Sequence, residues 1–201
     1  MIFVTACDHR YFAYLKVQIK NTYALFGKFP IVYDLGLRDY KRQLEQHGVK
    51  VKPKPAHVLP GKDYPRNYYP KALHKPYILL DVSISHDEPI LYMDADARPI
   101  KKFKIEKHDI VVSEVDGYER FKGTELEPYR GPVHSGVIYL NNFVGRDQFL
   151  LNWIYDMEAD PLPSDKKSFN KVIKDYDVHI LPEIVFDARK RAWDTLILHA
   201  K

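Results

Sequence analysis

Ile90-Leu91-Tyr92-Met93-Asp94-Ala95-Asp96 is the stretch of this 201-residue sequence that decides the fold. Four apolar residues in a row, after the turn-like segment 85–89, are typical of a strand buried on both faces of a parallel sheet. The strand then runs into two carboxylates. Where the chain leaves extended geometry, both can turn toward the crevice beyond the strand ends, which is where open α/β sheets bind ligands.

Asp94 and Asp96 offer hard oxygen donors with no cysteine or histidine beside them. Mg²⁺ and Mn²⁺ prefer such donors and keep open positions for water and phosphate oxygens. Acidic pairs also occur in solvated turns, but a solvated turn does not need an apolar strand leading into it. The stretch therefore predicts a divalent metal site that bridges a diphosphate.

The sequence on both sides of this stretch alternates between strand-like and helix-like patterns. Further strands are predicted at 2–6, 30–34, 49–51, 109–113, 179–182 and 195–199, and the segment 134–142 is predicted to open with a tight turn and run into an apolar strand. Helices are predicted at 11–27, 38–47, 71–84, 148–157 and 165–173. This alternation is typical of a parallel sheet with right-handed crossovers, and it makes the N-terminal third a candidate nucleotide-binding half.

Length and composition fit one α/β domain, because a chain of 201 residues with 45% hydrophobic residues can form one sizeable core. We expect a single domain over 1–201, with a nucleotide-binding half at 1–100 and an acceptor-binding half at 101–201. The single Cys7 excludes an internal disulfide framework. No signal peptide or membrane-spanning apolar run is apparent, so we expect a soluble, cytoplasmic protein without an integral membrane segment.

Several functional classes lack their sequence signatures. The net charge of +4 is mild, and no zinc-ligand spacing, RNA-recognition signature or basic helix accompanies it, so we expect no nucleic-acid partner. No G-x-G-x-x-G or Walker motif follows the first strand. This argues against a dinucleotide-dependent dehydrogenase and against a P-loop enzyme.

The order of the motifs resembles that of GT-A-fold glycosyltransferases, and in layout it is most similar to family 8, the glycogenin and galactosyltransferase group. The residues that carry the resemblance are Phe3-Val4-Thr5, Tyr92 to Asp96, His134-Ser135-Gly136-Val137, Asp165 to Asn170, Leu181-Pro182 and Ile197-Leu198-His199. They span nearly the whole chain in the family's order. The resemblance implies a single GT-A domain of the α/β class, in which helices flank a Rossmann-like, mostly parallel central sheet.

The resemblance also implies roles for individual residues. Asp94 and Asp96, with His199 completing the metal shell, would bind Mn²⁺ or Mg²⁺ together with the diphosphate of a UDP-sugar. Asp165 would lie against the donor sugar as the catalytic residue. The remaining donor-binding candidates are Thr5, Ala6, Asp8, Arg66, Lys71, Ala95, His134, Ser135 and Gly136. Among them, Arg66 and Lys71 could stabilise the departing diphosphate electrostatically.

The chain departs from the family pattern at three places. Lys166 stands where the family has glutamine, and His134 stands where asparagine is usual before Ser-Gly. Both positions are expected to read sugar hydroxyls, so the identity of the donor sugar stays open. The family's G-x-x-K-P segment does not follow His199, and its lysine would have to be replaced by Lys201 or by a basic loop residue, unless the sequence is a piece of a longer protein.

The predicted function is metal-dependent transfer of a sugar from a UDP-sugar donor to a glycan or another hydroxyl acceptor. The resemblance favours retention of the anomeric configuration, whereas Asp116 or Glu119 could serve as the base of an inverting enzyme. A sugar-1-phosphate nucleotidyltransferase is the alternative enzyme, although its glycine-rich phosphate loop is absent after the first strand. A non-enzymatic carbohydrate-binding module is the third possibility.

Purely structural roles are alternatives for three of these residues. His199 could be a surface or core histidine, and Asp165 could simply cap its helix. His134 could belong to a tight turn.

Overall fold

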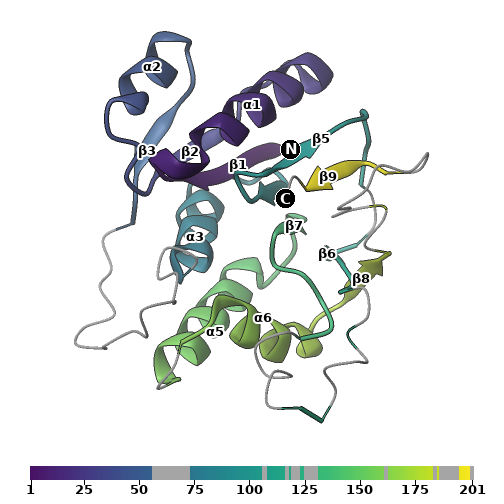
Figure 1. Ribbon diagram of the computed structural model, residues 1–201. Helices are drawn as coiled ribbons and strands as arrows, with labels where there is room; N and C mark the ends of the chain where they lie inside the picture. The colour runs from purple at the N-terminus through teal and green to yellow at the C-terminus, as the bar shows by residue number, and fades with distance from the viewer. Residues whose placement is uncertain are drawn as a thin grey trace.

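The computed structural model describes residues 1–55, 73–105, 108–115, 118, 123–124, 131–160, 163–182, 185 and 195–199. Within these residues a seven-stranded sheet has the order β3-β2-β1-β4-β7-β6-β8 (Figure 1). Its strands are β1 Ile2–Cys7, β2 Ile31–Asp34, β3 Val51–Pro53, β4 Ile90–Met93, β6 Ile110–Ser113, β7 Val137–Leu140 and β8 Val178–Leu181.

The sheet is mixed, with most of its neighbouring strands parallel. The pairs β1 with β2, β1 with β4, β2 with β3, and β6 with β8 are parallel, whereas β7 runs antiparallel to both β4 and β6. This arrangement confirms the predicted α/β class with a mostly parallel sheet. The carboxyl ends of β1 and β4 consequently meet at one edge.

Helices cover both faces of the sheet. They are α1 Phe12–Phe26, preceded by the short η1 His9–Tyr11, then α2 Tyr40–Gln46, α3 Lys75–Ser85, α5 Arg146–Ala159, and α6 Asp165–Val172, which is followed by η4 Ile173–Asp175. In Figure 1, α3, α5 and α6 lie together on one side of the sheet, and α1 and α2 lie on the other. The buried side chains divide in the same way, because successive strand residues point to opposite faces.

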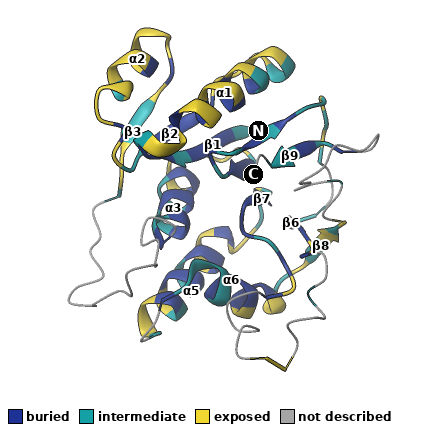
Figure 2. Ribbon diagram, in the orientation of Figure 1, coloured by how far each residue is buried: buried dark blue, intermediate teal, exposed yellow. Residues whose placement is uncertain are grey.

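Helix α1 illustrates how the sequence pattern sets the layers. Leu15 and Ile19, one turn apart, are buried beneath it, whereas Tyr14 and Val17 are exposed on its outer face (Figure 2). The helix ends at Gly27, whose φ of 68° is left-handed and whose N–H donates to the last turn. Glycine adopts this conformation at no steric cost, so the predicted helix end is where the structure has it.

A second, two-stranded sheet lies beside the first. Its strands are β5 Ala97–Pro99 and β9 Ile197–His199, which pair antiparallel with Ala97 opposite His199. The sequence patterns predict the last strand but not its partner, because β5 is only three residues long. This pairing brings the C-terminal histidine next to the acidic stretch, which lies about one hundred residues earlier in the chain.

Some predictions fall outside the described residues, namely those on Arg66, Lys71, Asp116, Glu119 and Lys201. No helix within the described ranges combines the length and the apolar character needed to cross a membrane.

Candidate active site

The acidic stretch leaves β4 in a tight turn that is held from two sides. The Asp94 N–H donates to the carbonyl of Gly136 (2.8 Å), and the Ala97 N–H donates back to the carbonyl of Asp94 (2.9 Å). From α1, the buried amide of Gln18 donates to the carbonyls of Asp94 (2.8 Å) and Ala97 (2.6 Å). Both ends of the turn are thus fixed, and the two carboxylates leave the sheet on the same side.

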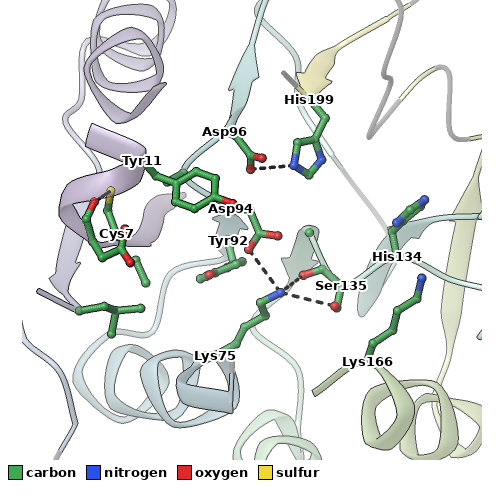
Figure 3. Close-up of a pocket in the computed structure, with 15 residues that line it drawn as sticks. Cys7, Tyr11, Lys75, Tyr92, Asp94, Asp96, His134, Ser135, Lys166 and His199 are labelled. Atoms are coloured by element: carbon green, nitrogen blue, oxygen red, sulfur yellow. Dashed lines mark hydrogen bonds and ion pairs between the residues drawn. The ribbon is translucent and has the colours of Figure 1, made fainter. Parts of the chain in front are cut away.

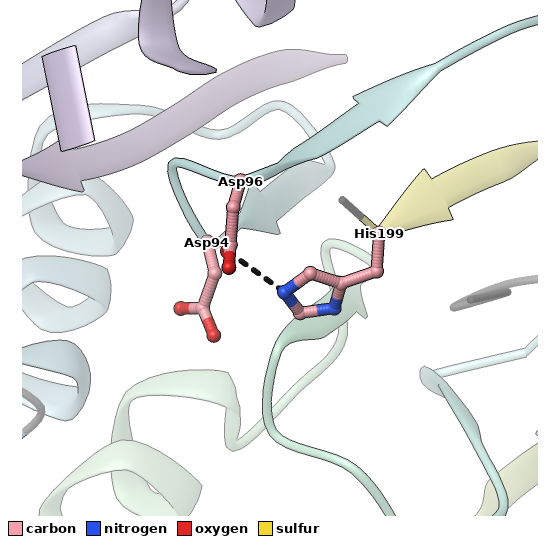
Figure 4. A group of neighbouring side chains, drawn as sticks. All are labelled: Asp94, Asp96 and His199. Carbon is pink, nitrogen blue, oxygen red and sulfur yellow. Dashed lines mark hydrogen bonds and ion pairs between the residues drawn. The ribbon is translucent and has the colours of Figure 1, made fainter. Parts of the chain in front are cut away.

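Asp94, Asp96 and His199 form a compact cluster beyond the strand ends (Figure 4). One ligand atom from each residue lies within 4.8 Å of the others, and no other such group of three occurs among the described residues. His199 Nε2 lies 2.7 Å from Asp96 Oδ1. Two carboxylates and one imidazole suit Mn²⁺ or Mg²⁺, so the donor set fits the ion that the sequence predicts.

Lys75 lies beside this cluster and is almost completely buried. Its ammonium lies 3.3 Å from Asp94 Oδ1 and 3.2 Å from Asp165 Oδ2, and it donates to the carbonyl of Ser135 at 2.6 Å (Figure 3). It also lies over the ring of Tyr92, 5.2 Å from the centroid. One lysine therefore connects the acidic turn, the strand β7 and the helix α6.

The charges of this group depend on one another. Burial opposes the charge of Lys75, yet the carboxylates of Asp94 and Asp165 outweigh it and raise the pKa of the ammonium. Burial raises the pKa of Asp94, whereas Lys75 and His199 act to lower it. Each positive charge near Asp94 therefore favours its ionised form, and a bound metal ion would act in the same way.

A cleft of about 290 Å³ opens at this edge of the sheet (Figure 3). Its lining consists of Ala6, Cys7, Asp8, Tyr11, Leu35, Lys75, Tyr92, Asp94, Ala95, Asp96, His134, Ser135, Gly136, Lys166 and His199. Of the predicted site residues within the described ranges, the structure places all but Thr5 and Asp165 in this lining.

The end of the cleft at β1 and η1 is partly aromatic and apolar. Tyr11 is 38% exposed, and Leu35 and Ala6 belong to the same lining. The carboxylate of Asp8 is buried and accepts two hydrogen bonds from the guanidinium of Arg10, at 3.0 and 2.9 Å. Thr5 is fully buried in β1 and does not reach the cleft.

The opposite end is polar and comes from the turn before β7 and the start of α6. His134, Ser135, Gly136 and Lys166 line it. Asp165 lies one layer behind, where its Oδ2 accepts from Ser135 Oγ at 3.1 Å and its side chain is 14% exposed. Asp165 is the first residue of α6, and Ser164 caps that helix.

Asn170 fixes the segment that leads into this turn. Its side chain accepts from the Val133 N–H (2.9 Å) and donates to the Val133 carbonyl (3.1 Å), replacing a strand partner. A Cβ at Gly131 would lie only 2.3 Å from the Asn170 side chain, so glycine is required there. The asparagine of the Asp165 to Asn170 motif thus positions the Ser-Gly turn.

Three residues of the site were missed by sequence reasoning: Gln18, Lys75 and Tyr11. Lys75 is four residues after Lys71, the predicted donor-site lysine, in the sequence. Gln18 carried a weaker signal, as a polar residue on the buried face of a predicted helix.

No protein-family model and no curated protein matches the sequence. Solved structures do match the fold. The galactosyltransferase LgtC in complex with donor and acceptor sugar analogues is 16% identical, with 99% of this chain and 86% of that chain covered and a TM-score of 0.58. A glycosyltransferase involved in glycosylation of the major capsid of PBCV-1 is 9% identical over 98% of this chain and 91% of that chain, with a TM-score of 0.57.

A third similar structure is the glycosyltransferase GlyE of Streptococcus pneumoniae TIGR4, which is 13% identical over 90% of this chain and 46% of its own length, with a TM-score of 0.52. All three neighbours are glycosyltransferases, in line with the enzyme class that the motifs imply. At these identities the likeness concerns the fold. The chain therefore has the GT-A fold that its motif order implied.

Proposed function

We propose that this protein is a metal-dependent glycosyltransferase that moves a sugar from a UDP-sugar to a hydroxyl group of a glycan or a similar acceptor. The observation that carries the proposal is the convergence of Asp94, Asp96 and His199 on one point in the lining of a cleft. Two carboxylates and one imidazole gathered there offer the donor set that a divalent cation prefers, which favours a ligand that contains a dication.

The ion and the diphosphate would occupy the centre of the cleft. Asp94, Asp96 and His199 would hold the ion, which when bound supplies Lewis-acid stabilisation of the leaving diphosphate. Lys75 supports this arrangement from behind, because burial raises the pKa of Asp94 and the nearby ammonium of Lys75 acts to lower it. The role of Lys75 is therefore to keep a metal ligand ionised and in place.

The two ends of the cleft would bind the two ends of the donor. Tyr11, a partly exposed ring in the cleft lining, offers a face on which a uracil base can stack. Ser135 and Gly136, at the opposite end, would contact the sugar. Asp165 does not line the cleft, so we assign it the positioning of Ser135 and Lys75 rather than direct contact with the sugar.

We also propose that the anomeric configuration is retained. The carboxylates that line the described cleft are Asp8, Asp94 and Asp96, of which the first is bound by Arg10 and the other two belong to the proposed metal cluster. Among the groups of the described cleft, the departing diphosphate oxygen is therefore our candidate to accept the acceptor proton, as the bond from the anomeric carbon to phosphate oxygen breaks and the bond to the acceptor oxygen forms. Product stereochemistry, read by NMR, tests this assignment.

Calorimetric titration with UDP tests the main proposal. We expect UDP to bind in the presence of Mn²⁺ and to lose at least about tenfold in affinity, roughly 1.4 kcal/mol, in excess chelator. His199→Gln should weaken the Mn²⁺ dependence. His179→Gln is the matched control, because His179 stacks on His108 in the β6 and β8 region and does not line the cleft.

Equal UDP affinity with Mn²⁺ and with chelator would exclude the proposed metal-bridged diphosphate. Incubation with UTP and a sugar 1-phosphate separates the alternative enzyme class, since release of pyrophosphate would identify a nucleotidyltransferase.

A further inference from the structure

The outer side of helix α1 exposes apolar and aromatic side chains along its length. Figure 2 shows exposed residues on this side of the helix, away from the sheet. Ala13, Val17 and Ala24 are exposed at spacings of four and seven residues, which places them on one ridge of the helix. Tyr14 and Tyr23, which are 42% and 52% exposed, flank this ridge on its two sides. The outer side of α1 is therefore an apolar surface that faces solvent.

Exposed aromatic rings are concentrated around this helix. Among the described residues, all exposed phenylalanine and tyrosine rings except that of Tyr155 belong to positions 11–40, namely Tyr11, Tyr14, Tyr23, Phe29 and Tyr40. The ring centroids of Tyr11 and Tyr14 are 6.2 Å apart, and Tyr23 is stacked on Phe29 at 4.4 Å. Exposed apolar side chains that gather on one surface, rather than scatter singly, mark a site of interaction with a protein or a membrane.

The charge on the same surface has one sign. The segment 9–33 contains no aspartate or glutamate, although the whole chain has 27. Lys16 and Lys20 are exposed on α1, and neither forms an ion pair with any residue that the structure describes. Lys16 instead lies over the ring of Phe12, 5.4 Å from its centroid. Two ammonium groups thus add positive charge beside the apolar ridge.

We propose that this surface, the α1 face (Tyr14, Lys16, Val17, Lys20 and Tyr23), docks the protein on an anionic lipid membrane. Apolar and tyrosine side chains are favoured at the depth of the lipid headgroups, and lysines beside them are attracted to a negatively charged leaflet. The long stems of the lysines allow their ammonium groups to reach the headgroups while the apolar ridge lies deeper. The α1 face is complementary to such a membrane in both charge and polarity.

Two other partners fit the α1 face less well. A second copy packed symmetrically on it would bring the lysines of both chains together, and repulsion between like charges would oppose that contact. A nucleic acid needs cationic groups along the path of its phosphates, whereas the centre of this face is occupied by Ala13, Val17 and Ala24.

The α1 face begins beside the cleft but does not belong to it. Tyr11, which lines the cleft, is the ring neighbour of Tyr14, whereas none of the five residues of the α1 face lines the cleft. Docking would therefore hold the Tyr11 end of the cleft near the lipid surface. The inference does not depend on the proposed function, because the mechanism above uses no residue of this face.

Vesicle flotation of the full chain tests the proposal. Partition onto vesicles of phosphatidylcholine is compared with partition onto vesicles in which about a third of the lipid is phosphatidylglycerol. We expect the partition coefficient to be at least about tenfold higher on the anionic vesicles. Raising the salt concentration from about 0.1 M to about 0.5 M should remove most of this difference, because salt screens exposed charges.

The charge contribution is tested with two double variants. Lys16→Gln with Lys20→Gln should lower partition onto the anionic vesicles about tenfold. Lys171→Gln with Lys174→Gln is the matched control, because it removes the same charge from exposed positions of α6 and η4, on the other side of the sheet (Figure 1). This control should leave partition unchanged.

The apolar contribution is tested at the centre of the ridge. Val17→Glu places a carboxylate where the membrane would lie and should abolish partition onto both kinds of vesicle. Val144→Glu is its control, because Val144 is fully exposed shortly before α5 and lies outside the α1 face. Thermal unfolding, which should be unchanged in every variant because the substituted side chains are exposed, shows that each protein is folded.

Several results would overturn the inference. They are equal partition onto neutral and anionic vesicles, absence of partition onto either, and equal losses in a variant and its matched control. Polyuridylate replaces the vesicles in a parallel assay, and binding to it without binding to vesicles would assign the α1 face to nucleic acid. In sedimentation velocity, a dimer that Val17→Glu dissociates, again without vesicle binding, would assign the face to a second copy of the chain.

Discussion

The metal cluster and the lysine beside it are two charged regions that share one residue, Asp94, yet they differ in how their charges are balanced. In the first, Asp94 and Asp96 face one imidazole. In the second, Lys75 is held by Asp94, Asp165 and Ser135 in a buried setting. The difference indicates that groups of the protein itself balance the charge of Lys75, whereas the carboxylates of the metal cluster favour the binding of a divalent cation. The lysine region should therefore control stability, and the metal cluster should control function.

The largest expected effect concerns the metal cluster alone. Asp96→Asn removes one ligand without touching Lys75, so we expect turnover to fall by at least about 1000-fold, roughly 4 kcal/mol of transition-state stabilisation. Stability should change by less than about 1 kcal/mol. UDP release from a donor panel and thermal unfolding measure the two quantities. If Asp96→Asn loses both turnover and folded structure, the metal cluster also controls stability, and the two regions do not differ as stated.

The second effect concerns the lysine region. Lys75→Met leaves Asp94 and Asp165 without their shared cation, so we expect the free energy of unfolding in chelator to fall by about 3 kcal/mol, a value at the low end for buried pairs because Asp94 is 35% exposed. Urea denaturation measures it. The control is Lys52→Met, because the pair of Lys52 with Asp81 is 22% and 45% exposed and should contribute less than about 1 kcal/mol. Equal losses of unfolding free energy in both variants would show that the burial of Lys75 does not increase its contribution to stability.

The pH dependence of stability sharpens the same comparison. The carboxylates around Lys75 raise its folded-state pKa despite burial, so its stabilisation is fully present below the unfolded value of about 10.4 and is lost as the pH rises through the folded value. Burial and the hydrogen bond to Asp81 also raise the pKa of Tyr33, so the stabilisation from its neutral hydroxyl is likewise lost at alkaline pH.

In excess chelator, unfolding free energy should therefore decline above about pH 10. Lys75→Met should flatten part of this decline, and Tyr33→Phe should flatten another part. A decline that both variants leave unchanged would assign the alkaline sensitivity to other groups.

The smallest effect concerns the backbone of the acidic turn. Gln18→Ala removes the two hydrogen bonds to Asp94 and Ala97, which should lower stability by about 1 to 2 kcal/mol and Mn²⁺ affinity severalfold. Asn21→Ala is its control: it removes one bond from the same helix, to the carbonyl of Pro99, beyond the turn. If the two variants bind Mn²⁺ equally well, the hydrogen bonds from Gln18 do not position the metal ligands.

The sequence was sufficient to predict the parts of the fold that depend on local pattern. The apolar run of β4, the alternation around it and the end of α1 at Gly27 follow from residue spacing and turn chemistry, and the structure confirms them. Asp94 and Asp96 were placed correctly at the strand end for the same reason.

The remaining features depend on contacts between distant segments. The pairing of β5 with β9 joins two three-residue strands, which carry almost no periodic signal, and yet it is what brings His199 to Asp96. The antiparallel direction of β7 is likewise not encoded in its four apolar residues. The family resemblance pointed to Lys71 as a donor-binding lysine, whereas the lysine that contacts Asp94 in the described residues is Lys75, at the start of α3.

Crystals grown with Mn²⁺ and UDP would test the central claim most directly, through the anomalous difference map of the manganese. We predict one strong peak within bonding distance of Asp94, Asp96 and His199, in contact with the diphosphate of UDP and with the uracil at Tyr11. A peak elsewhere, or UDP bound in the cleft with no ion at these three residues, would contradict the account.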